Sequence, residues 1–100
     1  MAENPLATLE KLDPKLIHHL RETNALVYCE GALPKKYKLL MAMAFDAAHG
    51  AYEGVKALAG SAMKEGATKE EIAEALRVAY QLAGVGSLYT ASRGLKELLG

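Results

Sequence analysis

Apolar residues return at helical spacing from the beginning of the chain. Leu6, Leu9 and Leu12 lie three positions apart. Asn4 and Pro5 precede them, and this pair is typical of a helix start, because asparagine caps free backbone N–H groups and proline suits the first helical position. The pattern therefore predicts a short helical arm at the N-terminus.

A second helix is predicted to begin at Asp13 and Pro14, which repeat this start signal, and to end near Gly31. Its apolar positions recur along one side, at Leu16, Ile17, Leu20, Val27 and Tyr28. Polar residues take the other side, among them His18, Arg21 and Glu22. The pattern is that of an amphipathic helix with one covered face.

Leu33 and Pro34 open a third predicted helix, which runs to a break at Gly50. The stretch 39–45 within it is apolar all the way round, so we expect neighbouring helices to cover it on several sides. For this reason Met41 and Met43 are assigned to the core, as is Met63 in the helix that follows.

A fourth helix is predicted over residues 51–65 and is closed by Gly66. Its inward positions are Val55, Leu58, Ala59, Ala62 and Met63. Thr68 and Glu71 have the spacing of a capping box, in which each side chain binds a free backbone N–H, so a fifth helix is expected to begin there. Its apolar face comprises Ile72, Ala75, Leu76, Ala79 and Ala83.

The segment from Gly84 to Gly86 interrupts the pattern, and Ser87 is expected to cap a last helix that contains Gly94. The apolar positions of that helix are Leu88, Ala91, Leu95, Leu98 and Leu99. Ala and Leu supply 34 residues of the chain, against 10 from Val, Ile and Thr, which favours helices over sheets. The sequence therefore predicts an all-α protein with a single structural domain.

The charge balance argues against nucleic acid and membrane partners. Twelve basic residues match twelve acidic ones, and the densest positive cluster, Lys35, Lys36 and Lys38, is interpreted as a solvated face. No segment reaches the roughly 20 apolar residues of a membrane span, and the first residues are acidic where a signal peptide is basic. The single cysteine, Cys29, excludes an intrachain disulfide, so we expect a cytoplasmic protein.

Self-association is expected from the same composition. Hydrophobic residues make up 51% of the chain, and a monomer of 100 residues cannot bury them all, especially around a helix that is apolar all round. We therefore predict a symmetric homo-oligomer that buries faces of the third and fourth helices.

Three blocks of the sequence resemble a known family. They are Gly31 to Leu39, then Ala62-x-x-x-Gly66-Ala67-Thr68-x-Glu70-Glu71-Ile72-x-Glu74-Ala75, then Tyr80 to Gly84. Their order and spacing are similar to the carboxymuconolactone decarboxylase and alkylhydroperoxidase D-like families, over roughly residues 24 to 98. The resemblance divides the chain into residues 1–23, the arm with the start of the second helix, and residues 24–100, the family's helical domain.

The family resemblance implies a helical fold of about five to six helices, assembled as trimers or hexamers. It also implies a peroxidase-like oxidoreductase connected with peroxide or oxidative stress, whose redox members carry Cys-x-x-Cys and a following His at a helix start. Counted from Gly66, those three positions fall here on Ala51, Gly54 and Leu58, and a Glu of the preceding helix falls near Leu39. The decarboxylase members keep the His at the Leu58 position. The two-cysteine centre is therefore absent from this chain.

Four polar residues cluster beside these positions and are the candidate catalytic residues: Asp46, His49, Tyr52 and Glu53. If helical geometry continues through Gly50, Asp46, His49 and Glu53 line one face, and a His between carboxylates suits general acid or base catalysis near neutral pH. The alternative interpretation is electrostatic, with His49 near one helix C-terminus and Glu53 near the next helix N-terminus. No second His-bearing motif accompanies them, so no metal site is predicted.

Cys29 is the remaining chemical candidate. It is interpreted either as a reactive thiol, activated by His49 or by a neighbouring subunit, or as a small buried apolar residue. No motif in the chain calls for a cofactor, and none is predicted.

Three functions stay open at this point. The first is a peroxidase-like oxidoreductase that does not use a dithiol. The second is a non-catalytic, oligomeric descendant of the family that binds a small molecule or another protein. The third and most distant is a decarboxylase of a lactone or dicarboxylate, which would need cations near the site, where the sequence offers only Lys56.

Overall fold

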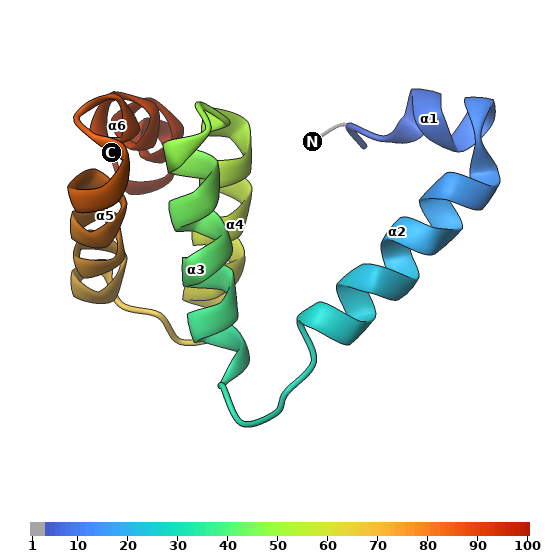
Figure 1. Cartoon of the computed structure of the whole chain (residues 1–100), viewed down its shortest axis with the longest axis horizontal. Helices are drawn as coiled ribbons and strands as arrows, with labels where there is room; N and C mark the ends of the chain where they lie inside the picture. The colour runs from blue at the N-terminus through green and yellow to red at the C-terminus, as the bar shows by residue number, and fades with distance from the viewer. Residues whose placement is uncertain (1–3) are drawn as a thin grey trace.

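The computed structural model describes residues 4–100, and within them it contains six α-helices and no strands. The helices are α1 (Ala7–Leu12), α2 (Pro14–Val27), α3 (Lys35–Ala48), α4 (Tyr52–Lys64), α5 (Lys69–Ala83) and α6 (Gly86–Leu99). Figure 1 shows two parts, a bundle of α3 to α6 and an arm of α1 and α2. The predicted all-α fold is confirmed.

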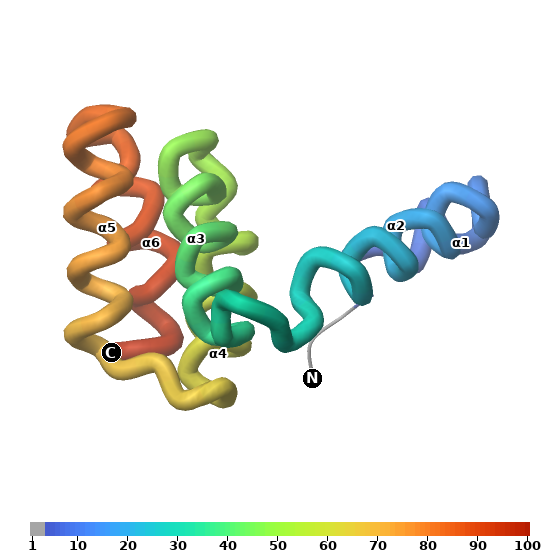
Figure 2. Tube along the Cα trace, turned by 60° about the horizontal axis from the view of Figure 1, so that its bottom comes forward, coloured from blue at the N-terminus to red at the C-terminus, as the bar shows by residue number. Residues whose placement is uncertain are grey.

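Successive helices of the bundle, α3 to α6, run in alternating directions, as the two views show together (Figures 1 and 2). Helix α3 packs on α4 and α5, and α6 closes the bundle against α4. The core residues come from all four helices and from the α4–α5 turn: Leu39, Leu40, Met43, Ala47, Val55, Ala59, Ala62, Ala67, Ile72 and Ala91. Because half of these side chains are alanine, the helices approach closely.

Helices α4 and α6 approach each other closely at Gly94. A Cβ built on Gly94 would overlap the Tyr52 carbonyl oxygen and lie 3.0 Å from Val55 Cβ. The absence of a side chain at this position therefore allows the two backbones to meet, and it places the start of α4 against α6.

The arm is a helical hairpin that leaves the bundle at the base of α3 (Figure 1). Ile17 is its single buried residue among those described, with 2% of its surface exposed. Asp13 caps α2 as predicted, since its side chain accepts a hydrogen bond from the Leu16 N–H at 3.1 Å. An ion pair between Arg21 and Glu10 also joins α2 to α1.

The predicted capping box at the start of α5 is confirmed. The Glu71 N–H donates to the Thr68 hydroxyl at 3.0 Å, and the Thr68 N–H donates to the Glu71 carboxylate at 2.9 Å. Gly66 precedes them with a φ of +97°, a conformation that side chains rarely adopt, so the α4–α5 turn is fixed by its sequence.

Three local predictions were wrong. Ser87 does not cap α6, because it lies inside the helix, buried, and its hydroxyl donates to the Gly84 carbonyl at 2.7 Å. Met41 is 52% exposed and does not belong to the core, because α3 is covered on fewer sides than its composition suggests. Helix α2 ends a turn before Gly31, at Val27, and a loop leads to Pro34.

Among residues 4–100, no helix is both long enough and apolar enough to cross a membrane.

Candidate functional site

The candidate site lies at the junction of α3 and α4. Helix α3 ends at Ala48, and Gly50 turns the chain with a φ of +80°. Ala51 is the N-cap residue of α4, and its N–H donates back to the Asp46 carbonyl of α3 at 2.9 Å. The helix break that the sequence predicts at Gly50 therefore stands between the residues of the predicted cluster.

Asp46 occupies the space that a side chain at Gly54 would need. Gly54 is half-buried in the first turns of α4, and a Cβ built on it would overlap the Asp46 carboxylate and lie 2.8 Å from its Cγ. Ala51 is exposed at the helix start, and Leu58 is half-buried against the core. The resemblance assigns these three positions to two cysteines and a histidine. In this chain Ala51 presents an exposed methyl group, Gly54 lies in close contact with Asp46, and Leu58 packs against the core.

His49 is exposed at the C-terminus of α3, where its ring stacks on that of Phe45 with centroids 6.4 Å apart. Glu53 is exposed in the first turn of α4. Within residues 4–100, no hydrogen bond or ion pair joins His49 to Asp46 or Glu53. The two residues lie where the helix dipoles favour their charges, and the catalytic role remains a prediction.

Tyr52 has a partner that the sequence reasoning missed. The guanidinium of Arg93, on α6, lies 3.8 Å from the centre of the Tyr52 ring, a cation–π contact that fixes the half-buried ring. No motif marks Arg93, because the contact depends on how α6 crosses α4 at Gly94.

Lys56, the cation that the sequence offers near the site, is already paired. Lys56 forms an ion pair with Glu97 of α6, and its ammonium group lowers the pKa of that carboxyl group. Within residues 4–100, no group of three His, Cys, Asp or Glu side chains comes together that could hold a metal ion.

Cys29 is exposed in the loop after α2, so its interpretation as a buried residue was wrong. Its thiol donates to the Leu26 carbonyl at 3.2 Å, and the ammonium group of Lys38 donates to the Cys29 carbonyl at 2.8 Å. A peroxide or a thiol reagent can reach this sulfur, and the positive charge of Lys38 lies against the carbonyl oxygen of the same residue.

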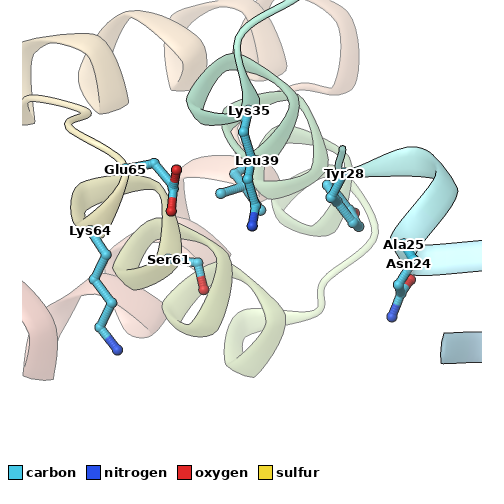
Figure 3. Close-up of a pocket in the computed structure, with 8 residues that line it drawn as sticks. All are labelled: Asn24, Ala25, Tyr28, Lys35, Leu39, Ser61, Lys64 and Glu65. Atoms are coloured by element: carbon cyan, nitrogen blue, oxygen red, sulfur yellow. The ribbon is translucent and has the colours of Figure 1, made fainter. Parts of the chain in front are cut away.

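A pocket of about 410 Å³ lies where the end of α2 faces α3 and α4 (Figure 3). It is lined by Asn24, Ala25, Tyr28, Lys35, Leu39, Ser61, Lys64 and Glu65. In Figure 3, Lys35, Ser61 and Glu65 gather on the bundle side, and Tyr28 and Asn24 stand on the arm side. No sequence motif marks this pocket, because its residues come from three separate helices.

The class of protein is an all-helical one, with a four-helix bundle that follows a two-helix arm. The junction of α3 and α4 in this chain contains no thiol. The chain matches the carboxymuconolactone decarboxylase family over residues 10–97, and it therefore belongs to this family. No curated protein and no solved structure matches the chain. The family predicted from the sequence blocks is confirmed, and the match includes α2 as well as the bundle.

Proposed function

We propose that this family member is a binding protein, which takes up a small carboxylic acid and does not run a dithiol peroxidase cycle. The exclusion of a dithiol cycle is supported by the contact between Asp46 and Gly54. The family's second cysteine position is not merely substituted, because the neighbouring carboxylate fills the space of its side chain. The single cysteine of the chain, Cys29, cannot form an intrachain disulfide.

The pocket in Figure 3 is the proposed binding site. Its volume of about 410 Å³ falls in the range that small-molecule sites occupy. Within residues 4–100, neither Lys35 nor Lys64 forms an ion pair, in contrast to Lys36 and Lys56. The ammonium group of Lys35 suits a carboxylate, and Glu65 suits a hydroxyl or amino donor on the same ligand.

Isothermal titration with malate, a small hydroxy acid, tests this proposal. We expect saturable binding by the whole chain and no binding of the uncharged diamide of malate. Lys35→Gln should weaken binding about tenfold or more, because a hydrogen bond to a charged group contributes about 1.5–3 kcal/mol. The control is Lys69→Gln, an exposed residue of α5 outside the pocket. Equal binding of malate by wild type and Lys35→Gln would exclude the site.

Peroxidase-like turnover is the second candidate, and the exposed thiol of Cys29 favours it. In such a reaction the thiolate attacks the O–O bond, an alcohol or water leaves, and an external thiol reduces the sulfenic acid that remains. Hydroperoxide consumption in the presence of an external thiol, lost in Cys29→Ser, would support this function. Loss of turnover in His49→Ala or Glu53→Ala would show that the predicted acid–base residues take part in the reaction. Absence of turnover in wild type would exclude the reaction.

Decarboxylation at the α3–α4 junction has the least support. A substrate carboxylate there would compete with Glu97 for Lys56, the cation that the sequence offers near the site. The proposed pocket lies elsewhere, at the other end of α4 and the beginning of α3.

A further inference from the structure

The pocket between the arm and the bundle contains opposite charges that do not pair with each other. Lys35 in the first turn of α3 and Glu65, the C-cap residue of α4, both line it (Figure 3). Within residues 4–100, neither side chain forms an ion pair, whereas Lys36, the next residue along α3, is paired with Glu71. The pocket therefore offers a ligand both a cation and an anion.

Each charge has a second lining residue one helical turn away. Leu39 lies four residues after Lys35, so the two side chains share a face of α3. Ser61 lies four residues before Glu65, and the two share a face of α4. One wall of the pocket therefore combines a cation with an apolar side chain, and the other combines a carboxylate with a hydroxyl group.

The arm adds to the apolar part of the pocket. Ala25 and Tyr28 line it from the end of α2. Leu39 is 5% exposed, and Tyr28 is half-buried against the same core. Because core packing restrains Leu39 and Tyr28, they offer a ligand a fixed apolar surface beside the charged groups.

We propose that the ligand of this pocket is an α-amino acid with an apolar side chain. Its carboxylate binds the ammonium group of Lys35, and its own ammonium group donates to the Glu65 carboxylate and to the Ser61 hydroxyl oxygen. Its side chain packs on Tyr28 and Leu39. This inference rests on the function proposed above, because it names the class of carboxylic acid that the same pocket takes.

An ammonium group fits the α4 wall better than a hydroxyl group does. Two acceptors, on Ser61 and Glu65, line that wall, and one of them is charged. An ammonium group has three donors and a positive charge, whereas a hydroxyl group has one donor and no charge. An amino acid can therefore satisfy both acceptors at once, which a hydroxy acid cannot do through its hydroxyl group.

Isothermal titration with leucine and with leucic acid, in which a hydroxyl group replaces the ammonium group, tests the assignment of the charges. We expect the whole chain to bind leucine about fivefold more tightly at low salt, because an ion pair near the protein surface adds to the contact with Lys35. Glu65→Gln should bind the two ligands equally and keep the helical circular dichroism of wild type. The control is Glu70→Gln, which removes the same charge from an exposed position of α5 outside the pocket and should retain the preference.

Glycine tests the apolar contact. It has the carboxylate and the ammonium group of leucine but no side chain to pack on Tyr28 and Leu39. Leucine should bind at least about tenfold more tightly than glycine, because burial of each CH₂ group favours binding. Equal affinities for glycine and leucine would overturn the proposal.

The same titrations separate this inference from the proposed function. Equal affinities for leucine and leucic acid in wild type, or a preference for leucine that survives in Glu65→Gln, would overturn the amino-acid assignment. If leucic acid and malate bind and leucine binds no more tightly, the pocket takes carboxylic acids and only this inference fails. If none of the three ligands binds, the proposed function fails as well.

Discussion

At the residue scale, the side chain of Asp46 packs closely over Gly54. The carboxylate sits in the space above the glycine, in the first turns of α4, where redox members of the family are expected to carry a cysteine. Restoring a side chain there requires Asp46 to move. The proposed absence of a dithiol site is therefore consistent with the packing at this position.

Gly54→Ala should destabilise the protein by about 1–3 kcal/mol, because the new methyl group overlaps the Asp46 carboxylate. In an Asp46→Ala background the overlap is removed, and the same change should stabilise the protein by about 0.5–1 kcal/mol through the helix preference of alanine over glycine. Urea unfolding of the four proteins gives both values. The same sign in both backgrounds would show that Asp46 does not fill this space.

Glu71 makes the stability of the chain depend on pH. Its backbone hydrogen bond from Thr68, followed by its hydrogen bond from Lys36, lowers the pKa of the carboxyl group below the ordinary value of 4.5. Because the pKa is lower in the folded than in the unfolded state, this stabilisation is present above about pH 4.5 and is lost as the pH falls through the lowered pKa.

Glu71→Gln should therefore reduce the loss of stability on acidification. Glutamine retains the capping box at this position but carries no charge. Urea unfolding between about pH 7 and about pH 3 should show a smaller decrease for the variant than for wild type, over the range where the carboxyl group titrates. An equal decrease in both proteins would mean that titration of Glu71 does not affect the free energy of unfolding.

At the scale of the elements, helix starts and turns were the most predictable features. Asp13 with Pro14, Thr68 with Glu71, and Gly66 each act through their own backbone neighbours, so the sequence contains all that is needed to place them. Ser87 was misplaced because serine also bonds backwards within a helix, to the Gly84 carbonyl. A local pattern does not distinguish these two uses of the hydroxyl group.

The close crossing of α4 and α6 requires a glycine at position 94. Gly94→Ala should destabilise the protein by about 1–3 kcal/mol, because its Cβ would overlap the Tyr52 carbonyl oxygen of the facing helix. The control is Gly60→Ala in α4, where the added Cβ would lie 3.8 Å from Leu98 Cδ1, an ordinary contact distance. This change should stabilise the protein by about 0.5–1 kcal/mol, because alanine is favoured over glycine in a helix. Thermal or urea unfolding distinguishes them, and equal effects would contradict the close crossing.

At the scale of the whole molecule, the family and the fold class could be predicted from the sequence. Which apolar side chains stay exposed, and where a pocket forms, could not. The apolar residues of α2 and α3 are equally periodic whether they face a core or remain exposed, so Met41 and Phe45 could not be told apart from Met43 by pattern. The pocket around Lys35 and Ser61 depends on the angle at which the arm leaves the bundle. That angle is a tertiary property with no local signal.

The most direct test of the proposed function is a map of where a small carboxylic acid binds. Amide chemical shifts of the whole chain, recorded during a titration with malate, should change at Asn24, Lys35 and Ser61 and stay constant around Ala51 and Gly54. This result would place binding in the pocket between the arm and the bundle. Changes confined to the α3–α4 junction, or no changes at all, would contradict the account.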